Sequence, residues 1–254
     1  MGKVGIYNIE KKIGLLTFSD NINYGSYLQT FALYYVVKTL GYNVELIDFR
    51  KNVPDYEAIT AKGMLRILSN SGYVDGIELI TNILKMQCSF RKLIKSTMNI
   101  SRRYTRNNIN KCVRFYDVFL IGSDLVWDLR YADDYTYMLD FVPRQSKKIA
   151  YAASCGYTSI PYDVKNNFIK YLSRFDRISV REQNSSEELH LLLDKPIPLV
   201  CDPTMLLSDK FWKKWIGHNN QKSTYVLVYM PDAEGEITAK AKRYARKHKM
   251  KIFN

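Results

Sequence analysis

Residues 13–49 read IGLLTFSDNINYGSYLQTFALYYVVKTLGYNVELIDF. An apolar run at 13–18 is followed by a polar turn, a helical pattern at 27–40 and a second apolar run at 44–49. A strand, a helix and another strand in this order are typical of a βαβ unit. Ser26 is the expected N-cap of the helix. We expect the helix to bury the face formed by Leu28, Phe31, Ala32, Tyr35 and Val36.

Apolar runs of strand length recur along the rest of the chain. Most of them lack alternation of apolar and polar residues, which is typical of strands in a parallel sheet covered by helices on both faces. We therefore predict an α/β fold with a Rossmann-like, doubly wound parallel sheet. The further predicted strands are 118–121, 149–153, 178–180, 197–200 and 225–230.

Two domains are expected from the position of a polar stretch at 217–223. Residues 1–220 would form an N-terminal Rossmann-like domain, and residues 221–254 the incomplete start of a second one. About thirty residues do not close a core of their own. The chain is therefore expected to stop inside its second domain.

The composition is that of a globular protein with a strong basic excess. Of 254 residues, 46% are apolar and 25% charged, and the formal net charge is +13. Residues 79–116 contain basic side chains and no acidic one. This segment is either a solvated helical face or a docking surface for something anionic, such as a lipid-linked glycan, an anionic membrane or nucleic acid. No nucleic-acid-binding motif accompanies the charge, so we expect no nucleic-acid partner.

The spacing of the cysteines bears on whether a metal site is expected, and the lack of long apolar segments bears on the cellular compartment. The four cysteines, at 88, 112, 155 and 201, form no C-x-x-C pair, so no metal site is expected. No signal peptide or stretch of 18 apolar residues is present. We expect a cytoplasmic protein, and peripheral contact with the inner face of an anionic membrane is compatible with this location.

The turn after the first strand, Asn23-Tyr24-Gly25-Ser26, offers polar groups and one glycine at the start of a helix. In open α/β sheets, ligands bind beyond the carboxyl ends of the strands. A helix N-terminus there provides free N–H donors for an anion. The turn is therefore either an anion-binding site or simply a well-capped helix start.

The third strand runs into Gly122-Ser123-Asp124, with Trp127 close behind. A carboxylate at this edge could position or deprotonate a sugar hydroxyl, and an indole could stack on a sugar face. The alternative is that Asp124 caps the next helix and Trp127 fills the core.

Two later strand ends carry further candidates. Ser154 follows the fourth predicted strand among small residues that leave room for a ligand. Arg181, followed by Glu182, ends the fifth. An arginine there could clamp a carboxylate or phosphate, or it could form a structural salt bridge with Glu182.

The ordered motifs resemble those of the polysaccharide pyruvyl transferase family, over about residues 13–230. Leu125 stands where the commoner family motif has Gln. The resemblance implies two Rossmann-like domains and a transferase that moves the enolpyruvyl unit of phosphoenolpyruvate onto two hydroxyls of a sugar, as a ketal, in cell-surface polysaccharide biosynthesis. The matching segments are 23–29, 121–127, 151–154, 179–182 and 202–204.

For this chemistry we expect Arg181 to hold the donor's carboxylate or phosphate, the 23–26 turn to position the substrates, and Asp124 to act on the acceptor hydroxyl. The expected partners are phosphoenolpyruvate and a sugar or lipid-linked glycan, with no further cofactor. A nucleotide-sugar-dependent glycosyltransferase and a non-catalytic anion- or nucleic-acid-binding protein are the alternatives. The remaining expected substrate-binding residues are Gly122, Ser123, Trp127, Ser154 and Glu182.

Overall fold

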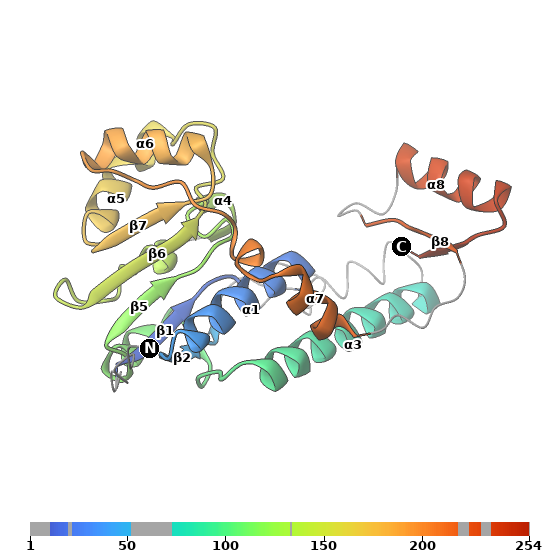
Figure 1. Cartoon of the computed structure of the whole chain (residues 1–254), viewed down its shortest axis with the longest axis horizontal. Coiled ribbons are helices and arrows are strands. Elements are labelled where there is room, and N and C mark those ends of the chain that lie inside the picture. Colours follow the sequence, from blue (N-terminus) through green and yellow to red (C-terminus); the bar gives the residue numbers. More distant parts are fainter. Residues whose placement is uncertain are drawn as a thin grey trace, which may run out of the picture. The chain divides into compact units, whose positions relative to one another are not determined.

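The computed structural model describes residues 11–19, 22–51, 73–132, 134–217, 224–229 and 235–253. The chain divides into two compact units, the first ending at Leu207 and the second beginning at Ser208. Figure 1 shows the longer strands of the first unit side by side in its main sheet.

The first unit is built on a five-stranded parallel sheet in the order β2-β1-β5-β6-β7. Every residue of the central strand β5 is buried, as expected for a strand covered on both faces. The predicted α/β fold with a Rossmann-like parallel sheet is confirmed. The strands are β1 (Lys12–Leu16), β2 (Asn43–Leu46), β5 (Val118–Ile121), β6 (Lys147–Ala153) and β7 (Arg177–Val180).

Helices and a small second sheet complete this unit. α1 packs against β2, and α5 packs against α6. The small parallel sheet pairs β3 (Phe49–Arg50) with β4 (Tyr104–Thr105). The helices are α1 (Tyr24–Thr39), α3 (Tyr73–Thr97), α4 (Leu129–Ala132), α5 (Tyr162–Leu172) and α6 (Gln183–Leu193), with 3₁₀ turns η2 (Ile109–Phe115), η3 (Thr136–Met138) and η4 (Pro203–Leu206).

The start and the buried face of α1 differ from the sequence expectation. The N-cap is Asn23, not Ser26, because the Asn23 side chain accepts a hydrogen bond from the Ser26 amide. The buried face is also rotated from the predicted one: Phe31 and Ala32 are buried, but Leu28, Tyr35 and Val36 are not. The residues that take their place are Tyr27, Thr30, Leu33, Tyr34 and Val37.

The predicted strand at 197–200 is wrong. This segment contributes only an isolated bridge between Leu199 and Val180 of β7. It runs along the sheet edge and leads into Asp202, where η4 begins. The segment therefore brings Asp202 to the carboxyl end of β7 without adding a strand to the sheet.

The second unit contains two helices and a pair of parallel strands. β8 (Tyr225–Leu227) pairs in parallel with β9 (Lys251–Phe253). α7 (Asp209–Ile216) precedes them and α8 (Glu236–Lys247) connects them. A strand, a helix and a parallel strand form one βαβ unit. Among the residues with described structure in both units, none belongs to a helix with the length and apolarity needed to cross a membrane.

Candidate functional site at the carboxyl ends of the strands

Four of the five predicted motifs contribute to one pocket of about 290 Å³ at the carboxyl edge of the sheet, and the 151–154 motif does not. The start of α1, the segment after β5, the end of β7 and the turn into η4 all contribute to its wall. This is the edge at which open α/β sheets bind ligands. The lining residues are Asn23, Gly25, Ser26, Leu28, Gln29, Asp124, Arg181, Asp202 and Thr204.

The turn that starts α1 is fixed by its own side chains. Asn23 Oδ1 accepts a hydrogen bond of 3.1 Å from the Ser26 amide. A Cβ on Gly25 would lie 3.1 Å from the same oxygen, so glycine keeps this cap uncrowded. Tyr24 is 55% exposed, and its ring lies 4.9 Å from that of Phe90. Tyr24 does not line the pocket, whereas Asn23 and Gly25 do.

Asp124 is held in place by both its side chain and its backbone. Its Oδ2 accepts a 2.5 Å hydrogen bond from Ser26 Oγ, which joins the segment after β5 to α1. Its backbone φ is 81°, a left-handed conformation that is uncommon for a residue with a Cβ. The amides of Val126 and Ser154 donate to the Asp124 carbonyl, at 2.8 and 3.1 Å, and so hold this conformation. Strained backbone of this kind is concentrated at functional sites.

Arg181 is the centre of an ion-pair network. Its Nε donates to Glu182 Oε1 at 2.8 Å. Its Nη1 donates to Asp202 Oδ2 at 2.9 Å and to Ser123 Oγ at 3.0 Å. Among the described residues Nη2 has no hydrogen-bond acceptor, so this nitrogen remains available to a ligand. The arginine is therefore both paired with Glu182, as the structural interpretation expects, and part of the pocket wall.

Asp202 connects this network to the turn at η4. Its Oδ1 accepts hydrogen bonds from the Thr204 amide and hydroxyl, and its Oδ2 accepts one from Ser123 Oγ. Burial by itself would raise the pKa of Asp202, but the bonds from Thr204, Arg181 and Ser123 outweigh it and hold the pKa below its usual value. The pKa of Arg181 is raised, because its bonds to Glu182 and Asp202 outweigh the opposing effect of burial. Both groups are therefore charged at neutral pH.

Of the nine expected substrate-binding residues, only Asn23, Gly25 and Ser26 line the pocket. The other six lie outside its wall: Tyr24, Gly122, Ser123, Trp127, Ser154 and Glu182. Trp127 is fully buried, and its indole N–H donates to the Tyr137 carbonyl, so the ring fills the core and offers no face to a sugar. Ser154 is 1% exposed and supports Asp124 through its backbone. A Cβ on Gly122 would lie 2.9 Å from the Cβ of Thr17, so this glycine permits close packing against β1.

Gln29 is a wall residue that was not among the predicted site residues. Its Nε2 donates to Thr17 Oγ1 and to the Ser26 carbonyl, both at 3.0 Å. Its Oε1 is buried and, within the described part of the chain, accepts no hydrogen bond. An unpaired buried acceptor is costly unless a ligand or water donates to it. Gln29 stands within the matched 23–29 motif, but its role depends on packing that the sequence does not reveal.

Carboxylates outnumber guanidinium groups in and around the pocket wall. Over most of this wall, the charge therefore favours a neutral ligand that carries hydroxyl groups. One guanidinium, from Arg181, faces the carboxylates of Asp124 and Asp202, and Glu182 pairs with Arg181 from the side. No cluster of three or more metal-ligating side chains occurs among the residues described. Burial raises the pKa of the nearby Cys155 thiol to about 12, so this cysteine is not an available nucleophile at neutral pH.

Comparison with known proteins identifies one family. The family model for polysaccharide pyruvyl transferase matches residues 23–250. No curated protein and no solved structure matches the chain. The matched region includes every segment that lines the pocket.

Proposed function

Because the chain belongs to the polysaccharide pyruvyl transferase family, a transferase family, we propose that it moves the pyruvyl unit of phosphoenolpyruvate onto two hydroxyls of a sugar. The product is a cyclic ketal and inorganic phosphate. We place the acceptor, a sugar or lipid-linked glycan of a cell-surface polysaccharide, in the pocket lined by Asn23, Ser26, Gln29, Asp124 and Arg181.

The observation that carries this proposal is the set of hydrogen-bond acceptors in the pocket. Asp124 has a carboxylate in the wall, and Gln29 contributes a buried Oε1 without a partner among the described residues. A sugar presents several hydroxyl donors, which would add to the two hydrogen bonds that the Asp124 carboxylate accepts from Ser26 Oγ and from the Leu125 amide. An anionic group beside Asp124 would bring no donor and would be repelled, so we place the anionic donor at the Nη2 edge of Arg181.

In the proposed reaction, two sugar hydroxyls form C–O bonds to C2 of phosphoenolpyruvate, and phosphate is released. Protonation of the donor's methylene carbon makes C2 electrophilic, and the first sugar hydroxyl forms a C–O bond to it. Phosphate then leaves with its bonding electron pair, and the second hydroxyl closes the ring. One of the two hydroxyl protons replaces the proton taken up by the methylene, and the other leaves with phosphate. Asp124 is the proposed base for the attacking hydroxyl, held in position by its bond from Ser26.

Arg181 is the proposed contact to the donor in this arrangement. Glu182 and Asp202 hold its guanidinium at 2.8 and 2.9 Å, which orients the Nη2 edge. A fixed guanidinium loses less conformational freedom on binding a phosphate or carboxylate than a mobile one. Phosphoenolpyruvate would accept a hydrogen bond from Arg181 Nη2, while the carboxylates of Glu182 and Asp202 hold the arginine side chain in place.

The experiment is a calorimetric titration of phosphoenolpyruvate at physiological salt, with inorganic phosphate as the reference ligand. The matched pair of variants is Arg181→Ala and Lys213→Ala, because Lys213 is exposed and, within the described part of the chain, pairs with Asp209 on its own helix. The proposal predicts binding that is stronger than that of phosphate, lost in Arg181→Ala and kept in Lys213→Ala. Unchanged binding by Arg181→Ala would remove the role proposed for this arginine.

A further inference from the structure

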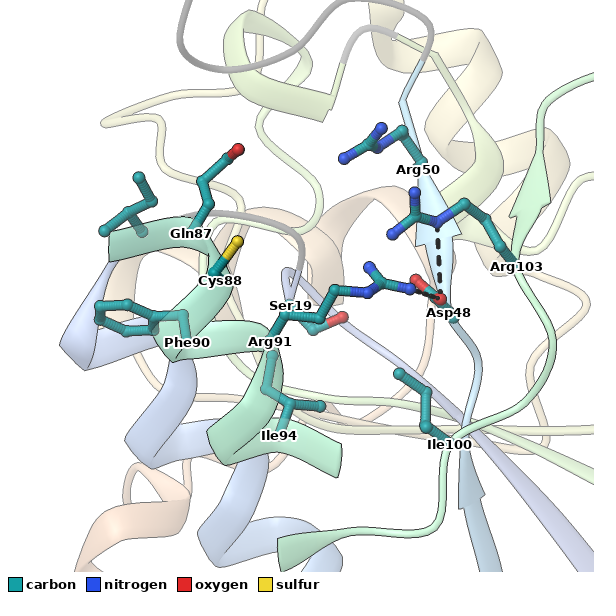
Figure 2. A pocket seen from close by; sticks show the side chains of 11 residues that line it. Ser19, Asp48, Arg50, Gln87, Cys88, Phe90, Arg91, Ile94, Ile100 and Arg103 are labelled. Carbon is teal, nitrogen blue, oxygen red and sulfur yellow. Dashed lines mark hydrogen bonds and ion pairs between the residues drawn. The ribbon is translucent and has the colours of Figure 1, made fainter. Parts of the chain in front are cut away.

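The nine basic residues of the acid-free segment 79–116 fall into two groups. Three of them, Arg91, Arg103 and Arg106, form ion pairs with carboxylates from other segments. Figure 2 shows two of these, the pairs of Arg91 and Arg103 with Asp48. The other six are exposed, and among the described residues none of them forms an ion pair. They are Lys85, Lys92, Lys95, Arg102, Lys111 and Arg114.

Three of the six exposed cations line one groove on the surface of the first unit. The groove has a volume of about 600 Å³, and its described lining residues include no acidic side chain. All of them lie within 80–132, a stretch that the structure describes without a gap. The groove shares no residue with the pocket at the carboxyl edge of the sheet. Its lining residues are Arg102, Asn110, Lys111, Val113 and Arg114.

The 3₁₀ turn η2 explains why two of these cations lie side by side. Ile109 and Cys112 of η2 are three positions apart, and both are buried. A 3₁₀ helix has about three residues per turn, so residues three positions apart lie on the same side of it. Lys111 and Arg114 are also three positions apart, and both are exposed. The period of η2 therefore buries one of its sides and presents these two cations on another.

The two arginines of the groove are oriented by aromatic rings. Arg102 Cζ lies 5.1 Å from the centre of the Tyr104 ring and 5.8 Å from that of the Phe115 ring, and Arg114 Cζ lies 4.8 Å from the centre of the Phe115 ring. Arg102 Nε also donates to the Tyr104 hydroxyl at 3.2 Å, and Tyr104 is buried. Contact with a ring orients a guanidinium without neutralising its charge. Both arginines therefore keep their positive charge for a partner.

Phe115, the last residue of η2, is an exposed aromatic ring within this cationic surface. Its exposed fraction is 41%, and both guanidinium groups lie over it. Apolar aromatic side chains next to lysine and arginine are typical of segments that lie in the headgroup region of a membrane. In that region the ring leaves water, while the cations contact lipid phosphates.

The form of the groove favours a lipid surface over a soluble anion or a nucleic acid. Apart from Val113, its lining residues are exposed, whereas sites for small ligands enclose most of the ligand. The charge is not accompanied by a nucleic-acid-binding motif in the sequence. A membrane that contains anionic lipids presents many phosphate groups in one plane, and cations on an open surface reach them without an enclosed site.

We propose that the groove formed by Arg102, Lys111 and Arg114, together with Phe115, docks this chain on a membrane surface of anionic phospholipids. The three cations contact the lipid phosphates, and the Phe115 ring enters the headgroup region. The paired arginines of segment 79–116 are not part of this surface. The docking does not depend on whether the chain transfers pyruvate, because the groove and the pocket at the carboxyl edge share no residue.

The experiment is sedimentation of the full chain with vesicles of phosphatidylcholine, with and without phosphatidylglycerol. The variants are Arg102→Gln, Lys111→Gln, Arg114→Gln and the combination of all three. The matched control is Lys147→Gln, which removes the same charge from an exposed position on β6 outside the groove. The assay involves no transfer reaction, so its result is independent of the proposed activity.

The proposal predicts binding to the vesicles that contain phosphatidylglycerol and a graded loss in the groove variants. Each single variant should weaken this binding roughly fivefold, and the triple variant roughly 100-fold, since each basic residue near an anionic surface contributes a similar free energy. Lys147→Gln should weaken it less than about twofold. Because salt screens these contacts, the differences between variants should shrink at high salt.

Three results would overturn the proposal. The first is equal binding to vesicles with and without phosphatidylglycerol. The second is an equal loss in Lys147→Gln, because the effect would then follow from net charge alone. The third is a groove that binds a DNA duplex instead, so that the groove variants weaken DNA binding and leave vesicle binding unchanged. If Arg102→Gln fails a thermal-unfolding check, Lys111→Gln provides the same test, since Lys111 is exposed and forms no ion pair among the described residues.

Discussion

Replacing Asp202 with alanine tests whether the Arg181 network holds the strand-edge site together. Asp202 accepts hydrogen bonds from the Thr204 amide and hydroxyl, from Arg181 Nη1 and from Ser123 Oγ. Loss of the turn cap costs about 1 kcal/mol. Leaving the Arg181 and Ser123 donors without this acceptor costs about 2 kcal/mol more. The variant should therefore lose about 3 kcal/mol of stability, or roughly 6–12 °C in Tm for a unit of this size.

The assay is urea unfolding followed by circular dichroism, with two comparison variants. Asp202→Asn keeps an acceptor for the Thr204 amide and should lose about half as much stability as Asp202→Ala. Asp163→Ala removes an exposed carboxylate from the first turn of α5 and should lose only about 0.3–1 kcal/mol. If Asp202→Ala is no less stable than Asp163→Ala, the network does not hold the site and the reasoning fails.

The same network has a defined pH dependence. The folded pKa of Asp202 lies below its usual value of 3.8, so its charged form is favoured by folding. Its contribution is therefore complete above that usual value and is lost as the pH falls through the lower, folded pKa. The stability difference between the wild type and Asp202→Asn should be constant from about pH 5 to 7 and shrink below about pH 4.

Three further predictions concern residues outside this network. Lys148→Met should lower the free energy of unfolding by about 2–4 kcal/mol, because the fully buried ammonium donates to three backbone carbonyls. The control is Lys147→Met at the exposed neighbouring position, which should change urea unfolding little. Gly122→Ala should lose about 1–3 kcal/mol in the same assay, because its Cβ would lie 2.9 Å from that of Thr17, which directly follows β1. Cys112 and Cys155 should resist iodoacetamide at pH 8 until urea unfolds the chain, since burial raises both pKa values to about 12; early modification of either, detected by peptide mass spectrometry, would contradict the described burial.

The sequence was sufficient to predict the parallel sheet and the edge of it at which Asp124 and Arg181 lie. Apolar runs at 13–18, 118–121 and 178–180 correspond to strands because each is buried in the sheet. Parallel strands bring their carboxyl ends to one edge, so motifs at those ends meet whatever their separation in sequence. Asp124 and Arg181 were placed at this edge by that rule, and the structure has both in one pocket wall.

Details that depend on packing were not predictable in the same way. Trp127 follows a predicted site segment closely, yet the chain turns it into the core, where its N–H meets the Tyr137 carbonyl. The helix α1 begins a few residues before the predicted start, at the Asn23 cap, and its packing buries a different face from the predicted one. A motif gives the position of a residue in the chain but not the direction of its side chain.

The ion pair between Arg91 and Asp48 shows a second kind of limit. The sequence marks 79–116 as basic, but nothing in it pairs this segment with Asp48. Arg91 and Asp48 are 43 positions apart, and they meet because α3 lies against the segment between β2 and β3. Such an ion pair is visible only after the fold is known.

The most direct test of the proposed function is a search for ketal formation by the chain itself. The protein is incubated with phosphoenolpyruvate and a mixture of oligosaccharides, and pyruvylated products are identified by mass spectrometry, in parallel for the wild type and Asp124→Asn. We expect a ketal that requires phosphoenolpyruvate and a rate at least about 100-fold lower in Asp124→Asn, since a general base contributes about 10²–10⁴ in rate. Transfer by Asp124→Asn at the wild-type rate would contradict it.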